Sequence, residues 1–277
     1  LKTFCREATS CSQPSSLLIR IVALPLTSTT KVMGCGASAA KGGAHTAKGE
    51  FADAPSDGKF HLRIISFNDL YAIDNLGKMK SLIDDKKVEE EGKSATIVTC
   101  NGDIMGGCLL FTLDKGASAV DVCNAIGVDY FCFGNHEFDH GKAPLEKRIA
   151  EFQGVWLNAN ISSNDPEDNL HKLCPATHVK EFAGGKLKVG LLGICTDASP
   201  DLTTGDTRKD GYVFSPPFEA GHKALAEKLV RGTDCDFTIC LTHLDEKEDD
   251  EFFEQARDTV DVCLGGHNHT PYFREET

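Results

Sequence analysis

The 277-residue sequence has little positive charge, no long apolar run, no C-x-x-C pair and no internal repeat. Its 42 acidic residues outnumber its 29 basic residues, so the basic surface that nucleic-acid binding requires is not expected. No apolar stretch reaches the roughly 20 residues that cross a bilayer as a helix, because the apolar residues 17–26 are too few and include Arg20. Without a C-x-x-C pair, a structural zinc site is not expected.

The twelve cysteines do not form the pattern of a disulfide framework. Five of them lie within or at the end of β-rich runs: Cys100, Cys132, Cys195, Cys240 and Cys263. A free cysteine in such a place behaves as a small buried hydrophobe. Because disulfides are rare in reducing compartments, this placement favours a reduced, cytoplasmic protein.

Residues 1–58 are predicted to be a disordered leader and linker. The sequence begins with Leu1, and its first methionine is Met33, a candidate true start that would make the preceding residues extra leader sequence. Residues 36–58 are rich in Gly, Ala, Lys and Ser, which is typical of a disordered linker. We therefore expect a single large domain over residues 59–277.

A lipid anchor is predicted next to Met33. The residues that follow match the myristoylation pattern M-G-x-x-x-[ST] at Gly34, and the adjacent Cys35 is a candidate palmitoylation site. Two lipids together would hold the protein at the cytoplasmic face of a membrane. Two alternatives stay open: a chance match in a flexible tail, or a signal-peptide remnant in residues 1–32, which would make the protein secreted.

Five short polar clusters each follow an apolar, β-rich run. The runs are residues 62–67, 95–99, 130–133, 237–241 and 260–264, and the clusters are residues 68–71, 101–103, 134–137, 242–243 and 265–269. Helical patterns alternate with the runs, which predicts an α/β domain with a mostly parallel sheet. The clusters are then expected to meet at one edge of one sheet, where their carboxylate, amide and imidazole groups suit manganese, iron or zinc.

Taken singly, each of these residues has an ordinary explanation. Asp69 and Asp103 could cap a turn or a helix, and His243 could be a local histidine with no ligand role. His267 and His269 are stronger candidates, because two histidines at this spacing in a glycine-rich turn can face one cavity.

The run from Asn135 to Asp139 is the most specific short pattern. Asn135 offers a neutral oxygen to a metal, and His136 titrates near pH 7. Asp139, three residues later, could hold His136 in one tautomer, as the carboxylate of a catalytic triad does. The run therefore combines a candidate metal ligand with a candidate acid–base pair.

Taken together and in this order, the clusters resemble the motifs of the calcineurin-like metallophosphoesterases, above all their 5′-nucleotidase branch. The family pattern runs Asp-x-His, Gly-Asp, Gly-Asn-His-(Asp/Glu), His and Gly-His-x-His. The resemblance implies a layered αββα sandwich with mixed, mostly parallel sheets. Because the sequence ends at Thr277, eight residues after His269, no further strand or helix is expected, and the domain should be truncated there.

The resemblance also implies phosphomonoester hydrolysis, as in nucleotide breakdown, with two divalent or trivalent metal ions (Mn, Zn, Fe, or Mg and Ca). Asp103 would bridge the ions, Asp69 and His269 would hold the first, and Asn135, His243 and His267 would hold the second. Two such ions clamp a phosphoryl group and activate water. His136, oriented by Asp139, would stabilise the transition state or protonate the leaving oxygen, contributing roughly 10²- to 10⁴-fold.

Two departures from the family pattern leave alternatives open. Tyr71 stands where the family has histidine, so either a phenolate ionised by the metal is a ligand, or the first metal loses one ligand. A tyrosine here is similar to that of nucleotidase-like sugar-phosphate phosphatases, notably mannosylglucosyl-3-phosphoglycerate phosphatase. A counterpart of the nucleoside-binding C-terminal domain is also missing. Sugar-phosphate or diester hydrolysis, and a degenerate membrane-tethered binding protein without catalysis, therefore remain alternatives.

Overall fold

The computed structural model describes residues 2–6, 17–23, 60–71, 76–89, 95–168, 170–230, 232–270 and 272–276. The predicted start at Met33, the lipidation sites Gly34 and Cys35, and the linker predicted for residues 36–58 lie outside these ranges. None of the helices described is long and apolar enough to cross a membrane.

One central layer is a five-stranded sheet in which all strands are parallel. Its order is β2 (Leu17–Ala23), β3 (Phe60–Phe67), β4 (Ala95–Asn101), β5 (Tyr130–Cys132) and β6 (Val155–Leu157). Helices α1 (Leu76–Glu89), α3 (Ala117–Ile126) and α4 (Lys142–Glu151) lie between consecutive strands in the sequence. Parallel neighbours need crossover connections of this kind.

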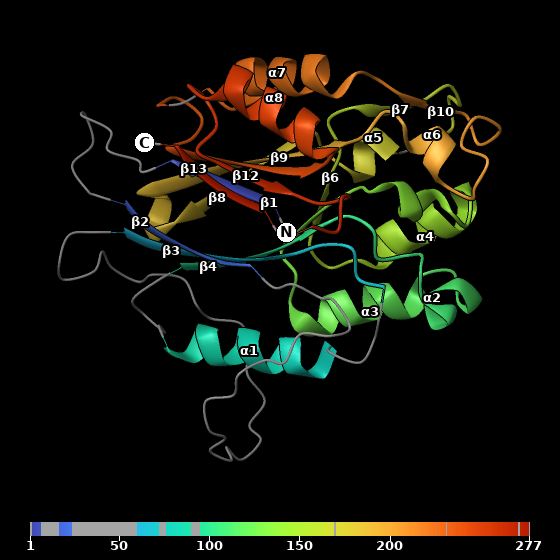
Figure 1. The fold of residues 1–277 in the computed structure, drawn as a ribbon, viewed down its shortest axis with the longest axis horizontal. Coiled ribbons are helices and arrows are strands. Elements are labelled where there is room, and N and C mark those ends of the chain that lie inside the picture. The colour runs from blue at the N-terminus through green and yellow to red at the C-terminus, as the bar shows by residue number, and fades with distance from the viewer. Residues whose placement is uncertain are drawn as a thin grey trace.

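The second central layer is a mixed, six-stranded sheet. Its order is β13 (Tyr272–Glu276), β1 (Lys2–Arg6), β12 (Val262–Gly265), β11 (Phe237–His243), β9 (Leu187–Cys195) and β8 (Thr177–Phe182). β9, β11 and β12 are parallel, whereas β1 and β8 run antiparallel to β12 and β9. Helices α7 (Pro217–Lys228) and α8 (Glu246–Ala256) cover its outer face (Figure 1).

The remaining elements are short. β7 (Ile161–Ser163) and β10 (Tyr212–Phe214) form a two-stranded antiparallel sheet. The other helices described are α2 (Leu109–Leu113), η1 (Asn135–Phe138), α5 (Leu170–Leu173), η2 (Ala183–Gly185) and α6 (Ser199–Leu202).

Alternate side chains of each strand enter different cores, as the two-residue period of a strand requires. On β3, Leu62 and Ile64 pack between the two sheets, whereas Ile65 and Phe67 pack against the helices. The result is four layers, with α1 and α3 below the two sheets and α7 and α8 above them (Figure 1). The predicted αββα sandwich with mixed, mostly parallel sheets is confirmed.

Three expectations about the chain's organisation need correction. Within residues 1–58, expected to be disordered, β1 and β2 are strands paired with β12, β13 and β3. The prediction that neither strand nor helix follows His269 is wrong, because β13 pairs with β1. Five residues are enough for such a strand, since backbone groups at a sheet edge are ready to pair. The polar clusters also follow strands of two sheets, not of one.

Nine cysteines lie within the described part of residues 95–270, and all nine are free. Eight of them are buried, and Cys108 is the partly exposed one. Over these residues the expectation of buried thiols in place of a disulfide framework is confirmed.

Candidate metal centre

The candidate ligands come from loops at the carboxyl ends of strands in both sheets. Asp69 follows β3, Asp103 follows β4, and His243 is the last residue of β11. Backbone hydrogen bonds join the first two loops, from Asp69 N to Gly102 O at 3.0 Å and from Leu70 N to Asp103 O at 2.9 Å. The predicted convergence of these clusters is therefore present, but it occurs between two stacked sheets.

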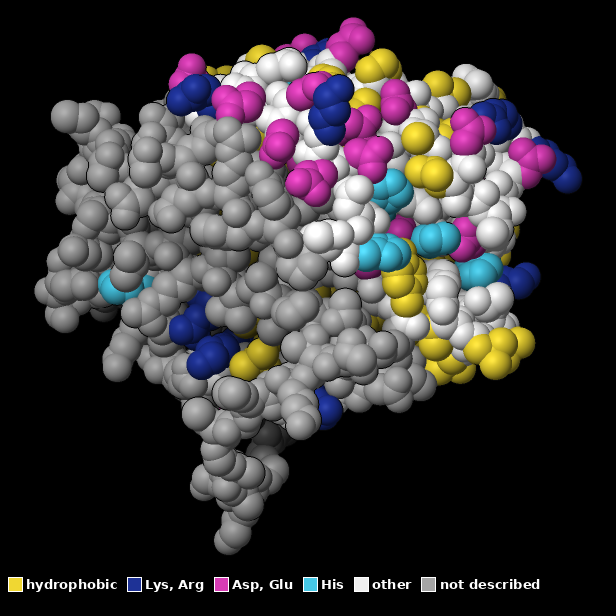
Figure 2. All heavy atoms as spheres, viewed as in Figure 1, with side chains coloured by type: hydrophobic (Ala, Val, Ile, Leu, Met, Phe, Trp, Pro, Cys, Tyr) yellow, Lys and Arg dark blue, Asp and Glu magenta, His cyan; other side chains and the backbone are white. Residues whose placement is uncertain are grey.

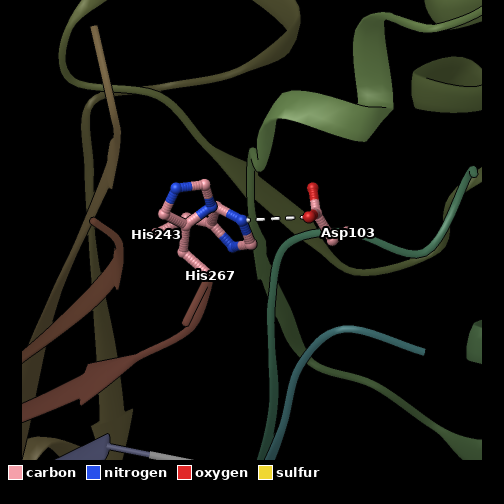
Figure 3. A group of neighbouring side chains, drawn as sticks. All are labelled: Asp103, His243 and His267. Atoms are coloured by element: carbon pink, nitrogen blue, oxygen red, sulfur yellow. Dashed lines mark ion pairs between the residues drawn. The ribbon is translucent and has the colours of Figure 1, made fainter. Parts of the chain in front are cut away.

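Two groups of candidate ligands share Asp103. The first, called the inner group here, is Asp103, His243 and His267; the second, the outer group, is Asp69, Asp103 and His269. Within each group, the ligand atoms lie within 4.8 Å of one another. Figure 3 shows the inner group, in which His243 Nε2 lies 3.2 Å from Asp103 Oδ2. In the outer group, His269 Nε2 lies 3.1 Å from Asp69 Oδ1.

Four of these five residues have a left-handed backbone conformation. The φ angles are 52° at Asp69, 59° at Asp103, 77° at His267 and 54° at His269. Only two other described non-glycine residues have a positive φ. Each such residue costs on the order of 1–3 kcal/mol, and strain of this kind concentrates at functional sites. The strain is independent support for a built site here.

His243 is held in the orientation that a metal ligand needs. Its ring is fully buried, and Nδ1 lies 2.7 Å from the carbonyl oxygen of Asn101, which favours a proton on Nδ1. Burial alone would lower the pKa of His243, but the charge of Asp103 and their hydrogen bond raise it to about 10. A metal ion bound here would take the place of the proton on Nε2.

The other inner ligands are already in the protonation states that bind metals. Burial and the neighbouring His243 lower the pKa of His267, which keeps its ring neutral. Burial would raise the pKa of Asp103, but His243, His136 and the Tyr71 hydroxyl lower it overall, so the carboxylate is ionised.

Asn135 supplies a further test of whether a metal fits. Its Oδ1 is buried and has no hydrogen-bond partner among the residues described. A buried polar atom left unpaired is costly, so such cases need an explanation. A divalent ion next to the inner group would satisfy this oxygen, and oxygen with imidazole is a normal donor set for such ions. The residues of the site therefore fit the predicted metals.

His136 and Asp139 form the predicted pair. His136 Nδ1 lies 2.8 Å from Asp139 Oδ2, and the backbone N–H of His136 donates to Asp103 Oδ1 at 2.9 Å. The hydrogen bond to Asp139 raises the pKa of His136 to about 9, against the effect of burial and with help from Asp103. Asp139 is held in turn by the Thr203 hydroxyl and the Thr204 N–H, both at 2.8 Å from its Oδ1.

Tyr71 lies among the outer ligands. Its hydroxyl donates to Asp103 Oδ2 at 2.7 Å, and lies 3.2 Å from both Asp69 Oδ1 and His269 Nε2. Burial and the two carboxylates raise the pKa of Tyr71, so the phenol is a neutral donor. The Tyr71 hydroxyl thus contacts all three residues of the outer group.

Figure 2 shows histidines gathered on one face of the molecule, below a surface rich in acidic side chains over α7 and α8.

Sequence reasoning missed two features of the site. Glu137 belongs to one of the polar clusters, but the sequence analysis assigned it no role. Its spacing from Gly134 could have indicated one, because a glutamate three residues after a helix N-cap can form a capping box. Thr203 lies 64 residues from Asp139 in the sequence, and no local pattern marked it.

A profile of the calcineurin-like phosphoesterase family matches residues 62–271. The trifunctional nucleotide phosphoesterase protein YfkN of Bacillus subtilis (strain 168) is 27% identical over 249 residues, covering 79% of this chain and 16% of that protein. A probable 5′-nucleotidase of Treponema pallidum (strain Nichols) is 28% identical over 184 residues, covering 66% of this chain and 30% of that protein. The chain thus spans less than a third of the length of either relative.

Among solved structures, the fold is similar to that of a 5′-nucleotidase precursor from Thermus thermophilus. The TM-score is 0.64 at 24% identity, covering 75% of this chain and 41% of that one. This similarity supports the fold alone. With the family match extending from β3 to the loop after β12, the chain belongs to the calcineurin-like phosphoesterase family.

Proposed function

We propose that this protein is a metal-dependent phosphomonoesterase of the 5′-nucleotidase type. The observation that carries the proposal is the pair of ligand groups that share Asp103, with the His136–Asp139 pair hydrogen-bonded beside them. A shared carboxylate between two groups is what a site for two adjacent ions requires.

Each ion would have its own set of protein ligands. The inner ion would be held by Asp103, Asn135, His243 and His267, and the outer ion by Asp69, Asp103 and His269. Ions so placed supply charge neutralisation for the phosphoryl group and an activated water at neutral pH. With Tyr71 as a neutral donor, Asp69, Asp103 and His269 would be the three protein ligands of the outer ion, and three protein ligands are common in catalytic metal sites.

The protein's own contribution centres on His136. Because Nδ1 of His136 is hydrogen-bonded to Asp139, Nε2 is the ring nitrogen that can face the substrate. We assign His136 the role of donating a proton from Nε2 to the leaving oxygen, while Asp139 and Thr203 fix the ring. The products would be an alcohol and inorganic phosphate. Loss of this acid would cost roughly 10²- to 10⁴-fold in rate.

A nucleoside monophosphate is the favoured substrate, because relatives by sequence include a nucleotide phosphoesterase and a probable 5′-nucleotidase. A sugar phosphate is the second candidate, and the tyrosine in the outer group favours it. Phosphate release from AMP, a sugar phosphate and a bis-ester, measured side by side, distinguishes nucleotidase, sugar-phosphate phosphatase and diesterase activity.

The first experiment counts bound transition metals in the folded chain and in Asp103→Asn, and measures phosphate release from the same samples. Near two ions per chain with activity, both lost in Asp103→Asn, is the expected result. Stoichiometric metal without phosphate release from any substrate would favour a binding protein. A folded protein that binds no metal would rule out the two-ion mechanism.

Membrane attachment is a separate proposal, supported by the sequence around Gly34 and Cys35. Gly34→Ala removes the myristoylation site, and we expect the variant to leave the membrane fraction of cells. Unchanged partitioning would rule out myristate as the anchor.

A further inference from the structure

The carboxylate of Glu137 is fully buried and accepts four backbone hydrogen bonds. Its Oε2 accepts from the N–H groups of Asp103 at 2.8 Å and Gly134 at 2.6 Å. Its Oε1 accepts from those of Ile104 at 2.8 Å and Met105 at 3.2 Å. Each oxygen therefore serves two backbone donors.

Local capping of η1 explains only one of these bonds. The bond to Gly134 spans three residues, whereas the other three reach across 32 to 34 residues to the loop of Asp103. Three consecutive N–H groups that converge on one carboxylate form a nest, a backbone arrangement that binds anions. Here the anion is a side chain of the neighbouring loop.

The nest includes the strained residue of the site. Asp103 has φ 59°, a conformation that persists only when its surroundings enforce it. The loops also touch directly, since a Cβ on Gly134 would clash with Asp103 Oδ1. Glu137 thus joins the loop of the shared ligand Asp103 to the loop of Asn135, and does so through their backbone N–H groups.

We propose that Glu137 is a positioning residue for the metal centre: it holds Asp103 in its strained conformation, so that the carboxylate shared by the two ligand groups stays in place between them. The inference rests on the proposed function, because it assumes that Asp103 binds metal. Residues that orient ligands without touching the metal typically affect affinity by roughly 10- to 100-fold when changed.

Glu137→Gln is the direct test, since the amide has the same shape but only one acceptor oxygen. Whichever way it lies, its NH₂ group faces two backbone N–H donors. The matched control is Asp261→Asn, another buried carboxylate that accepts a strand N–H, from Thr238 at 2.8 Å, outside the site. Circular dichroism melting confirms folding, and the dissociation constants for Co²⁺ are measured from its visible absorption.

We expect Glu137→Gln to weaken Co²⁺ binding by roughly 10- to 100-fold and to change the spectrum, with activity partly restored by excess metal. Asp261→Asn should melt earlier but bind Co²⁺ like the wild type. Affinity equal to that of the wild type in folded Glu137→Gln, or an equal loss in Asp261→Asn, would overturn the proposal. Wild-type protein without Co²⁺ binding would overturn the proposed function along with it.

Glu137→Asp keeps the experiment decisive if Glu137→Gln does not fold. The shorter side chain keeps its charge but withdraws both oxygens by one methylene, so it cannot reach both loops. We expect intermediate affinity from this variant. Wild-type affinity and an unchanged Co²⁺ spectrum in Glu137→Asp would show that the four-bond arrangement does not position Asp103.

Discussion

The inner and outer ligand groups share Asp103 but differ in burial and in the chemistry around them. In the inner group, the His243 side chain is fully buried and that of His267 is 19% exposed. In the outer group, the His269 side chain is 56% exposed, and a phenol contacts both carboxylates. A buried site strengthens electrostatic interactions and fixes its ligands before the metal arrives. We therefore expect two ions of unequal affinity, with the inner ion bound more tightly.

Removing the shared ligand should have the largest effect. Asp103→Asn weakens both groups at once, because the amide carries no charge to neutralise either ion. We expect both metals to be lost and phosphate release to fall to background. Elemental analysis of the purified variant gives the metal count, and a variant that kept one ion per chain would show that the two groups do not share this residue as a ligand.

The difference between the groups is tested directly by removing one imidazole from each. His243→Ala should lower the affinity for the inner ion by more than roughly 10²-fold, because removing a ligand costs more than removing a residue that only orients a ligand. His269→Ala should cost less, because water can reach the exposed position and replace the imidazole. Equilibrium dialysis with Mn²⁺ resolves the two sites. Equal losses in the two variants would contradict the proposed ranking.

Asp139→Asn should reduce the rate of phosphate release without loss of metal from the inner or the outer ligand group. We expect kcat to fall by about 10²-fold, the lower end of a general-acid contribution, with metal content unchanged. Since Asp139 raises the pKa of His136 to about 9, its loss lowers that pKa. The acid is active when protonated, below its pKa, so the alkaline limb of the rate profile should move to lower pH. A limb that stays in place would remove His136 as its source.

The sequence located the strands that carry the site more accurately than it arranged them. The predicted run 237–241 lies within β11, because its residues are largely apolar and both faces of the strand are buried. The prediction of one sheet was wrong, because a buried apolar strand carries no mark of which neighbour it pairs with. β8 was not predicted, because its residues Thr177–Phe182 are mostly polar and half-exposed and so do not form an apolar run.

The ligands were predictable from order and spacing, whereas their supports were not. Glycine-rich loops after strands marked Asp103, Asn135 and His267 as candidates. The contacts that hold the side chains depend on residues far apart in the sequence, such as Asn101 with His243 over 142 positions. Such contacts arise only once both sheets are stacked, so no local pattern could indicate them.

The smallest expected effect concerns Tyr71, and it changes the metal affinity of the outer group alone. Tyr71→His would give this group a second imidazole, and we expect its affinity for Mn²⁺ to rise by about tenfold, at the low end for changes around metal sites. Tyr71→Phe is the control, because it removes only the hydroxyl that donates to Asp103. If the phenol is a neutral donor, as its raised pKa indicates, Tyr71→Phe leaves the outer ion in place. Loss of that ion in Tyr71→Phe, or loss of a visible iron–phenolate absorption band, would instead show that Tyr71 is a ligand. A fourth protein ligand would then explain how the outer group can bind metal although His269 is exposed.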